Sequence, residues 1–131
     1  MNKNSHGFTV VEIIFVVALL ATASIFFFVQ KNGIEIVARD DSRKTAINAM
    51  YYSLEEVFYP AHKHYPQTID TNTLPSVDPA LFTDPNGLKL GQAGSDYTYH
   101  PTNCTDGQCK SYTLQSTLEN ESDYIKTNRE N

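Results

Sequence analysis

Two histidines separated by one residue have the spacing of a metal-binding pair. His62 and His64 flank Lys63, and a His-x-His pair can bind one metal ion when both rings point to the same side of the chain, as on a strand. Here the pair follows an expected helix end, between Pro60 and Pro66, where side chains two positions apart need not converge. We therefore interpret both as exposed histidines and expect no metal site.

The two cysteines, Cys104 and Cys109, have the spacing of a crosslink. The dipeptide Asp106-Gly107 between them is typical of a two-residue type I′ hairpin turn. That turn pairs Cys104 with Cys109 at a non-hydrogen-bonded position, where Cα atoms lie about 4.5 Å apart and a disulfide can form. The bond requires an oxidising compartment. Free thiols are the alternative, since two cysteines with only His100 nearby cannot fill a tetrahedral zinc shell.

Acidic residues alternate near the C-terminus, at Glu119, Glu121 and Asp123. Calcium prefers such carboxylates, but the glycine-containing turn of a dedicated calcium loop is missing, so we favour a solvated acidic face. The sequence shows no catalytic arrangement of nucleophile, base and orienting group. We expect neither an enzyme nor a cofactor.

Length and charge limit the partners further. A chain of 131 residues suits one small domain. Ten Lys and Arg residues are scattered among fifteen Asp and Glu residues, whereas a nucleic-acid surface needs a clustered basic patch. We therefore expect no nucleic-acid contact.

A single carboxylate, Glu12, interrupts the most apolar part of the chain. The 22 residues from Phe8 to Val29 carry no other formal charge, and as a helix they would span about 33 Å, close to the hydrocarbon thickness of a bilayer. A secretory signal has a shorter apolar stretch. A plain membrane anchor explains the length, but a charge in the apolar layer is costly and gives an anchor no advantage.

The stretch Lys3-Asn4-Ser5-His6-Gly7-Phe8-Thr9-Val10-Val11-Glu12, followed by the apolar run, resembles the class III signal of type IV prepilins. Pseudopilins of type II secretion and DNA-uptake machines share this signal. The family has a polar leader ending in Gly, then Phe, then Glu four residues later. The resemblance implies that a prepilin peptidase removes residues 1–7 by cutting between Gly7 and Phe8, and then methylates the new amine of Phe8.

The same resemblance implies a location and a set of partners. The protein would be a single-pass protein of the cytoplasmic membrane, surrounded by lipid, which an inner-membrane assembly platform then takes up. Copies of itself or related pilins would join it in a helical filament, which is extracellular in a pilus and periplasmic in a pseudopilus. Within it, Glu12 would meet the Phe8 amine of a neighbouring copy and so set the register, because a buried charge needs a partner. A monomeric membrane-anchored binding domain is the alternative.

The pattern after the apolar run predicts an α+β fold, in which a long N-terminal helix packs on a small antiparallel sheet, as in type IV pilins. Residues 8–29 form the membrane or filament-core half of the helix, and residues 30–59 form an amphipathic half that ends near Pro60. Gly33 is the weak point of this helix, because Ala21 and Val29 stand where many family members have Gly and Pro. The amphipathic stripe consists of Ile34, Val37, Ile47, Met50, Leu54, Val57, Phe58 and Ala61.

An irregular connection is expected over residues 60–96, which contain five prolines. Within it, Asp78-Pro79-Ala80-Leu81-Phe82 is predicted to form one helical turn that Asp78 caps.

The sheet is expected over residues 97–126, and residues 127–131 are predicted to be disordered. The cysteine register places Pro101 where it would have to donate a hydrogen bond, so we expect a bulge or a shift there. One face should pack on the helix through Tyr97, Tyr99, Tyr112, Leu114 and Leu118.

Overall fold

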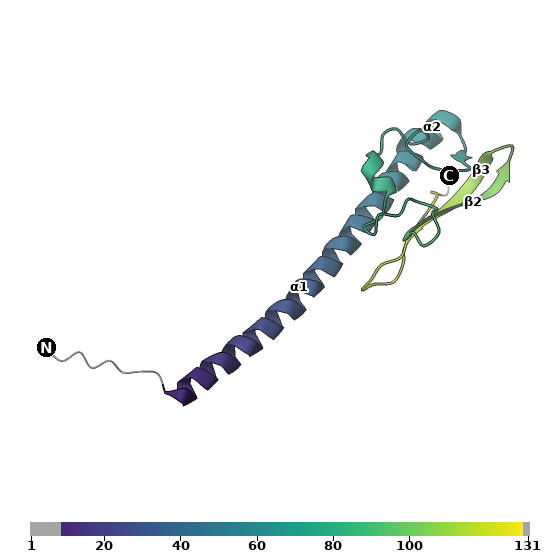
Figure 1. Cartoon of the computed structure of the whole chain (residues 1–131). Helices are drawn as coiled ribbons and strands as arrows, with labels where there is room; N and C mark the ends of the chain where they lie inside the picture. The colour runs from purple at the N-terminus through teal and green to yellow at the C-terminus, as the bar shows by residue number, and fades with distance from the viewer. Residues whose placement is uncertain (1–8, 130–131) are drawn as a thin grey trace. The chain divides into compact units, whose positions relative to one another are not determined.

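The computed structural model describes residues 9–129, apart from the side chain of Asn32. The expected leader and Phe8 lie outside the described residues. The chain divides into two units, Met1–Glu35 and Ile36–Asn131, and each is described by itself. The fold is α+β, as predicted, with a long apolar N-terminal helix and a small antiparallel sheet (Figure 1). The sheet has four strands.

Helix α1 (Val10–Tyr52) supplies the apolar segment of the first unit and passes through Gly33 without a break. Every residue from Val10 to Val29 is exposed. The large apolar side chains of this stretch keep 49–75% of their surface. By length and composition the helix can cross a membrane.

The helix ends later than its sequence predicts. Helix α1 leads directly into a π-helical turn, η1 (Ser53–Phe58), and a last turn, α2 (Tyr59–His62). In the π turn the N–H of Tyr59 bonds to the carbonyl of Leu54, five residues back. Pro60 then enters in the first turn of α2, where its missing N–H costs little. The helix therefore extends three residues beyond Tyr59.

Strand β3 (Gln108–Ser116) is the centre of the sheet, whose order is β1-β3-β2 with β4 also paired to β3. Strand β2 (Tyr97–Thr105) forms the hairpin with β3, and the predicted register is confirmed by Cys104 opposite Cys109. Strand β4 (Tyr124–Thr127) reaches one residue into the segment predicted to be disordered. Strand β1 (Tyr65–Pro66) was not predicted.

The bulge or shift expected near Pro101 is absent from the hairpin. Pro101 lies opposite Tyr112, in the same register that pairs the strand ends. The only interruption within this ladder is at Asn103, whose φ of 54° is left-handed. A shift by one residue would turn every buried side chain of the strand to the opposite face, and that cost exceeds the loss of one ladder bond.

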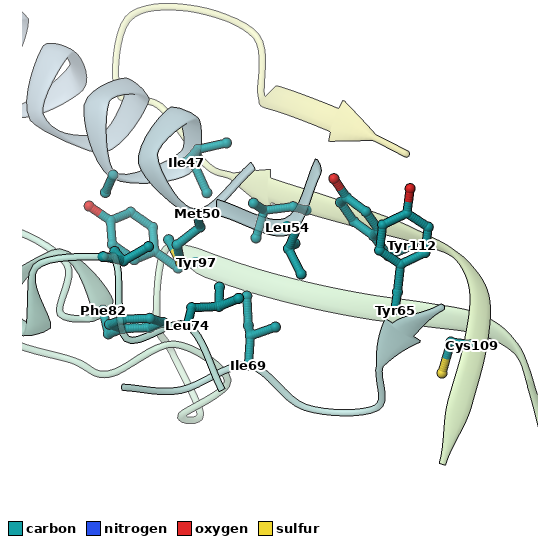
Figure 2. Packing of buried hydrophobic residues seen from close by; sticks show 13 residues of the cluster. Ile47, Met50, Leu54, Tyr65, Ile69, Leu74, Phe82, Tyr97, Cys109 and Tyr112 are labelled. Atoms are coloured by element: carbon teal, nitrogen blue, oxygen red, sulfur yellow. The ribbon is translucent and has the colours of Figure 1, made fainter. Parts of the chain in front are cut away.

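The second unit is built around side chains from the helix, the sheet and the connection (Figure 2). Ile47, Met50 and Leu54 of the predicted stripe are completely buried, whereas Val37 and Val57 remain about half exposed. The connection is more ordered than predicted. Its expected turn forms as η2 (Pro79–Phe82), with the Asp78 carboxylate accepting the N–H of Ala80. The connection also contributes Ile69, Leu74, Val77 and Phe82 to the core.

Candidate functional site

The carboxylate of Glu12 sits on the first turn of α1 and bonds to Thr9. Its Oε2 accepts the backbone N–H of Thr9 at 2.9 Å and the Thr9 hydroxyl at 3.1 Å, while the N–H of Glu12 donates to Thr9 Oγ1 at 3.3 Å. This reciprocal pattern is a capping box. Its signal, Thr-x-x-Glu before an apolar run, is present in the sequence and was missed. Gly7 and Phe8 lie outside the described residues.

No positive charge pairs with Glu12 within the described part of the chain. The salt bridge nearest to it in sequence joins Lys31 and Glu35. Its neighbours Val10, Val11 and Ile13 are exposed apolar side chains. If this carboxylate enters an apolar layer in the ionised state, it needs a cation from outside residues 9–129.

The other polar side chains of the apolar segment are satisfied within the helix. The hydroxyl of Thr22 donates to the carbonyl of Leu19 at 2.9 Å, and that of Ser24 donates to the carbonyl of Leu20 at 2.8 Å. Such local bonds leave no hydroxyl donor unmet when water is removed. Glu12 is the only ionisable residue in Val10–Val29, so its charge is the one polar feature of this segment that the helix does not neutralise.

A buried ion cluster lies where the helix enters the second unit. We call it the Arg43 cluster; its members are Arg39, Asp40, Arg43, Asp96 and Glu119. The guanidinium of Arg43, 2% exposed, contacts Asp40 at 2.9 Å, Asp96 at 2.8 Å and Glu119 at 2.8 Å. Arg39 holds both oxygens of Glu119 at 2.7 Å. The cluster ties the helix to the start of β2 and to the segment after β3.

Hydrogen bonding favours the ionised form of two carboxylates of the Arg43 cluster, Asp40 and Glu119. Burial opposes the charge of Asp40, but the backbone N–H groups of Glu119 and Asn120 and the Arg43 guanidinium outweigh it, so the pKa of Asp40 is lowered. Hydrogen bonds from Arg39 and Arg43 lower the pKa of Glu119 to about 2. The pairing of these charges was not predicted from the sequence. Asp40 and Arg43 nevertheless continue the three-and-four spacing of Ile47, which places them on the buried side of the helix.

A second buried carboxylate, Glu55, lies in the π turn. Its oxygens accept the hydroxyl of Tyr112 at 2.8 Å and that of Tyr65 at 3.1 Å. Only 5% of Glu55 is exposed. The Tyr65 and Tyr112 rings lie edge to face at 4.7 Å, so this carboxylate links the helix to β1 and β3. Its role is structural.

The cysteines form the expected disulfide, with Cα atoms 3.9 Å apart. Cys109 is completely buried and Cys104 is exposed. The Cys109 side chain points away from the ring of Tyr112 (Figure 2). The bond closes the hairpin next to strand β1, whose Tyr65 pairs with Cys109.

The acidic residues near the C-terminus each bind a different part of the chain. Glu119 belongs to the Arg43 cluster, Glu121 binds Lys44 at 2.7 Å, and Asp123 accepts the Gln115 amide at 2.6 Å. Over residues 9–129 no three His, Cys, Asp or Glu side chains gather as a metal site would require. The structure thus brings together Cys104 and Cys109, but it does not gather the acidic residues.

Comparisons of this chain with protein-family models, with curated proteins and with solved structures find no match. The arrangement of the long apolar helix, the small antiparallel sheet and the disulfide is therefore the basis for a functional argument.

Proposed function

We propose that the protein is a structural subunit of a type IV pilus-like filament, made as a membrane prepilin and assembled through its N-terminal helix. The observation that carries the proposal is an apolar helix, exposed along the whole of Val10–Val29, whose first turn bears one carboxylate that no cation among residues 9–129 pairs. A lipid bilayer would cover the apolar surface but would leave the charge of Glu12 without a partner. In a bundle of identical helices, neighbouring copies would bury the apolar surface and could also supply a cation to Glu12.

Cleavage between Gly7 and Phe8 supplies the missing cation in this proposal. The new amine of Phe8 carries a positive charge one helical turn from Glu12. The Thr9 capping box already holds the carboxylate at this end of the helix. Pairing Glu12 with the Phe8 amine of a neighbouring copy fixes the axial position of each subunit, because a slip would leave two charges unpaired in an apolar layer.

The second unit has the properties of an exported head domain. Its disulfide fits an oxidising compartment, and the Arg43 cluster fastens the C-terminal segment to the helix. These features suit a pilus outside the cell and equally a pseudopilus of a secretion or DNA-uptake machine.

The test of this function is the intact mass of the protein isolated from its native host. We expect a chain that begins at Phe8 and carries one methyl group on its amine. Gly7→Val should block cleavage, because the peptidase of this family needs a small residue before the cut. A mature protein that keeps residues 1–7 would instead support a membrane-anchored monomer and would overturn the proposal.

A further inference from the structure

The rings of the two histidines at the end of the long helix lie close together, although their sequence context provides no reason to expect this. Lys63 closes α2 with a left-handed φ of 62° and donates its N–H to the carbonyl of Tyr59 at 2.8 Å. This turn brings the rings of His62 and His64 to a centroid separation of 5.8 Å, with an interplanar angle of 74°. The irregular backbone thus places two imidazoles side by side.

Hydrogen bonds fix the tautomer of both rings. The Nδ1 of His62 lies 3.0 Å from the carbonyl oxygen of Phe58, and the Nδ1 of His64 lies 2.9 Å from that of His62. A carbonyl oxygen only accepts, so each Nδ1 carries the hydrogen and each neutral ring keeps its lone pair on Nε2. Metal-binding histidines are usually oriented in this way, by a bond from the other ring nitrogen to a carbonyl.

Packing holds the pair in place. The ring of Phe58 stacks on that of His62 with centroids 4.2 Å apart and lies edge to face with that of His64 at 5.9 Å. Directly after His64, Tyr65 is buried and paired with Cys109 in the sheet. Little side-chain freedom is therefore left to be lost when a ligand binds.

We propose that His62 and His64 bind one divalent transition-metal ion through their Nε2 atoms. Imidazole nitrogens suit copper, nickel and zinc, with bonds of about 2.1 Å. At tetrahedral or wider angles such bonds place the ring centroids roughly 5–6 Å apart, which agrees with the observed 5.8 Å. Among residues 9–129 no third His, Cys, Asp or Glu joins the pair, so water or a ligand from another molecule completes the shell.

The site favours borderline divalent ions, which prefer imidazole nitrogen to oxygen ligands. Because its ligands are two neutral imidazoles, affinity should follow Cu²⁺ above Ni²⁺ and Zn²⁺, with Ca²⁺ and Mg²⁺ much weaker. His62 is exposed and His64 is half-buried, so the ion can exchange with solvent. This site lies at the far end of the helix from Glu12 in sequence, and it does not depend on the filament proposal.

The test uses the full chain in detergent micelles, with His6→Asn as background so that only three histidines remain. Titration with Cu²⁺ and Zn²⁺, followed by calorimetry and by electron paramagnetic resonance of the copper, should give one ion bound by two nitrogens. His62→Asn and His64→Asn should each weaken binding at least about tenfold. The matched control His100→Asn, on strand β2, should leave it unchanged.

A second measurement needs no substitution at the site and so does not depend on how the variants fold. Diethyl pyrocarbonate modifies free imidazole nitrogens, and peptide mass spectrometry locates the product. Zn²⁺ should protect His62 and His64 but not His100. Equal modification of all three with and without Zn²⁺, or copper affinity that survives loss of both His62 and His64, would overturn the proposal.

Discussion

The two charged stretches of the long helix, around Glu12 and around Asp40, satisfy their carboxylates in different ways. Asp40 is buried and receives two backbone N–H groups and the Arg43 guanidinium from within its own chain. Glu12 has exposed apolar neighbours, and among residues 9–129 its carboxylate accepts hydrogen bonds from Thr9 alone. In the second unit, the buried charges of Asp40 and Arg43 are therefore paired within one chain. The apolar segment has an exposed surface, and among residues 9–129 no cation pairs with its carboxylate; under the filament proposal, neighbouring copies would supply both the cover and the cation.

Arg43→Met should have the largest effect on stability. It leaves the buried carboxylate of Asp40 without its cation, and breaking a buried pair in this way costs about 3–5 kcal/mol. Urea unfolding of the full chain in detergent, followed by the near-ultraviolet signal of the tyrosines, measures the loss. Lys44→Met, which removes a more exposed partner of Glu121, is the matched control and should cost much less. Equal losses for the two variants would refute the view that the second unit depends on its internal charge pairing.

Glu55→Leu should destabilise the second unit to a similar extent. The change leaves the hydroxyls of Tyr65 and Tyr112 buried without an acceptor, at about 1–3 kcal/mol for each group. Glu55→Gln keeps one acceptor oxygen and should recover much of the loss in the same urea experiment. If Leu and Gln were equally destabilising, the tyrosine hydrogen bonds would not be the reason that a carboxylate is kept in the π turn.

Loss of the disulfide should have a smaller effect. Replacing Cys104 and Cys109 together by Ser should destabilise the second unit by about 2 kcal/mol, because the bond closes a short loop. Membrane insertion should be unaffected, since it depends on the apolar segment alone. Labelling of the exported protein without reductant should find no free thiol, and full labelling would contradict the crosslink.

Acid should weaken the second unit through the Arg43 cluster. The pKa of Glu119 is about 2 in the fold and about 4.3 in an unfolded chain. The stabilisation by this group is thus complete above about pH 4.3 and is lost as the pH falls toward 2. Asp40 shifts in the same direction. Thermal unfolding between pH 6 and 2 should show a shallower acid decline for Glu119→Gln than for Glu121→Gln. If the two variants lost stability equally as the pH fell, the protonation of Glu119 would not explain the acid sensitivity of the second unit.

Most of the correct predictions of structure came from local sequence signals. The hairpin register followed from Asp106-Gly107, and the one-turn helix η2 followed from Asp78 and Pro79. Strand β1 escaped prediction because it has two residues and its partner, Cys109, is distant in sequence.

Part of the Arg43 cluster could have been predicted from the sequence. Asp40 and Arg43 lie on the apolar stripe, which is unusual for charges unless they are paired, but their partners Asp96 and Glu119 come from irregular segments that carry no periodic signal. The close approach of the His62 and His64 rings depends on the left-handed conformation of Lys63. A lysine gives no sequence signal for that conformation.

The comparison between Glu12 and Asp40 is tested most directly by filament assembly. Glu12→Gln retains an N3 side chain able to complete the capping box but removes the charge, whereas Thr9→Ala removes the cap and keeps the charge. Each variant is expressed in a host with the assembly machinery, and cleavage after Gly7 is checked by mass in the same sample. Sheared-filament yield is then compared with abundance in the membrane fraction.

The account predicts that the unsubstituted chain and Thr9→Ala are recovered in sheared filaments. Cleaved Glu12→Gln should accumulate in the membrane and assemble poorly, because the Phe8 amine of each neighbouring copy lacks its partner. Filaments of Glu12→Gln at the unsubstituted yield would contradict the charge pair. A cleaved, unsubstituted chain that never enters sheared filaments would contradict the filament subunit itself.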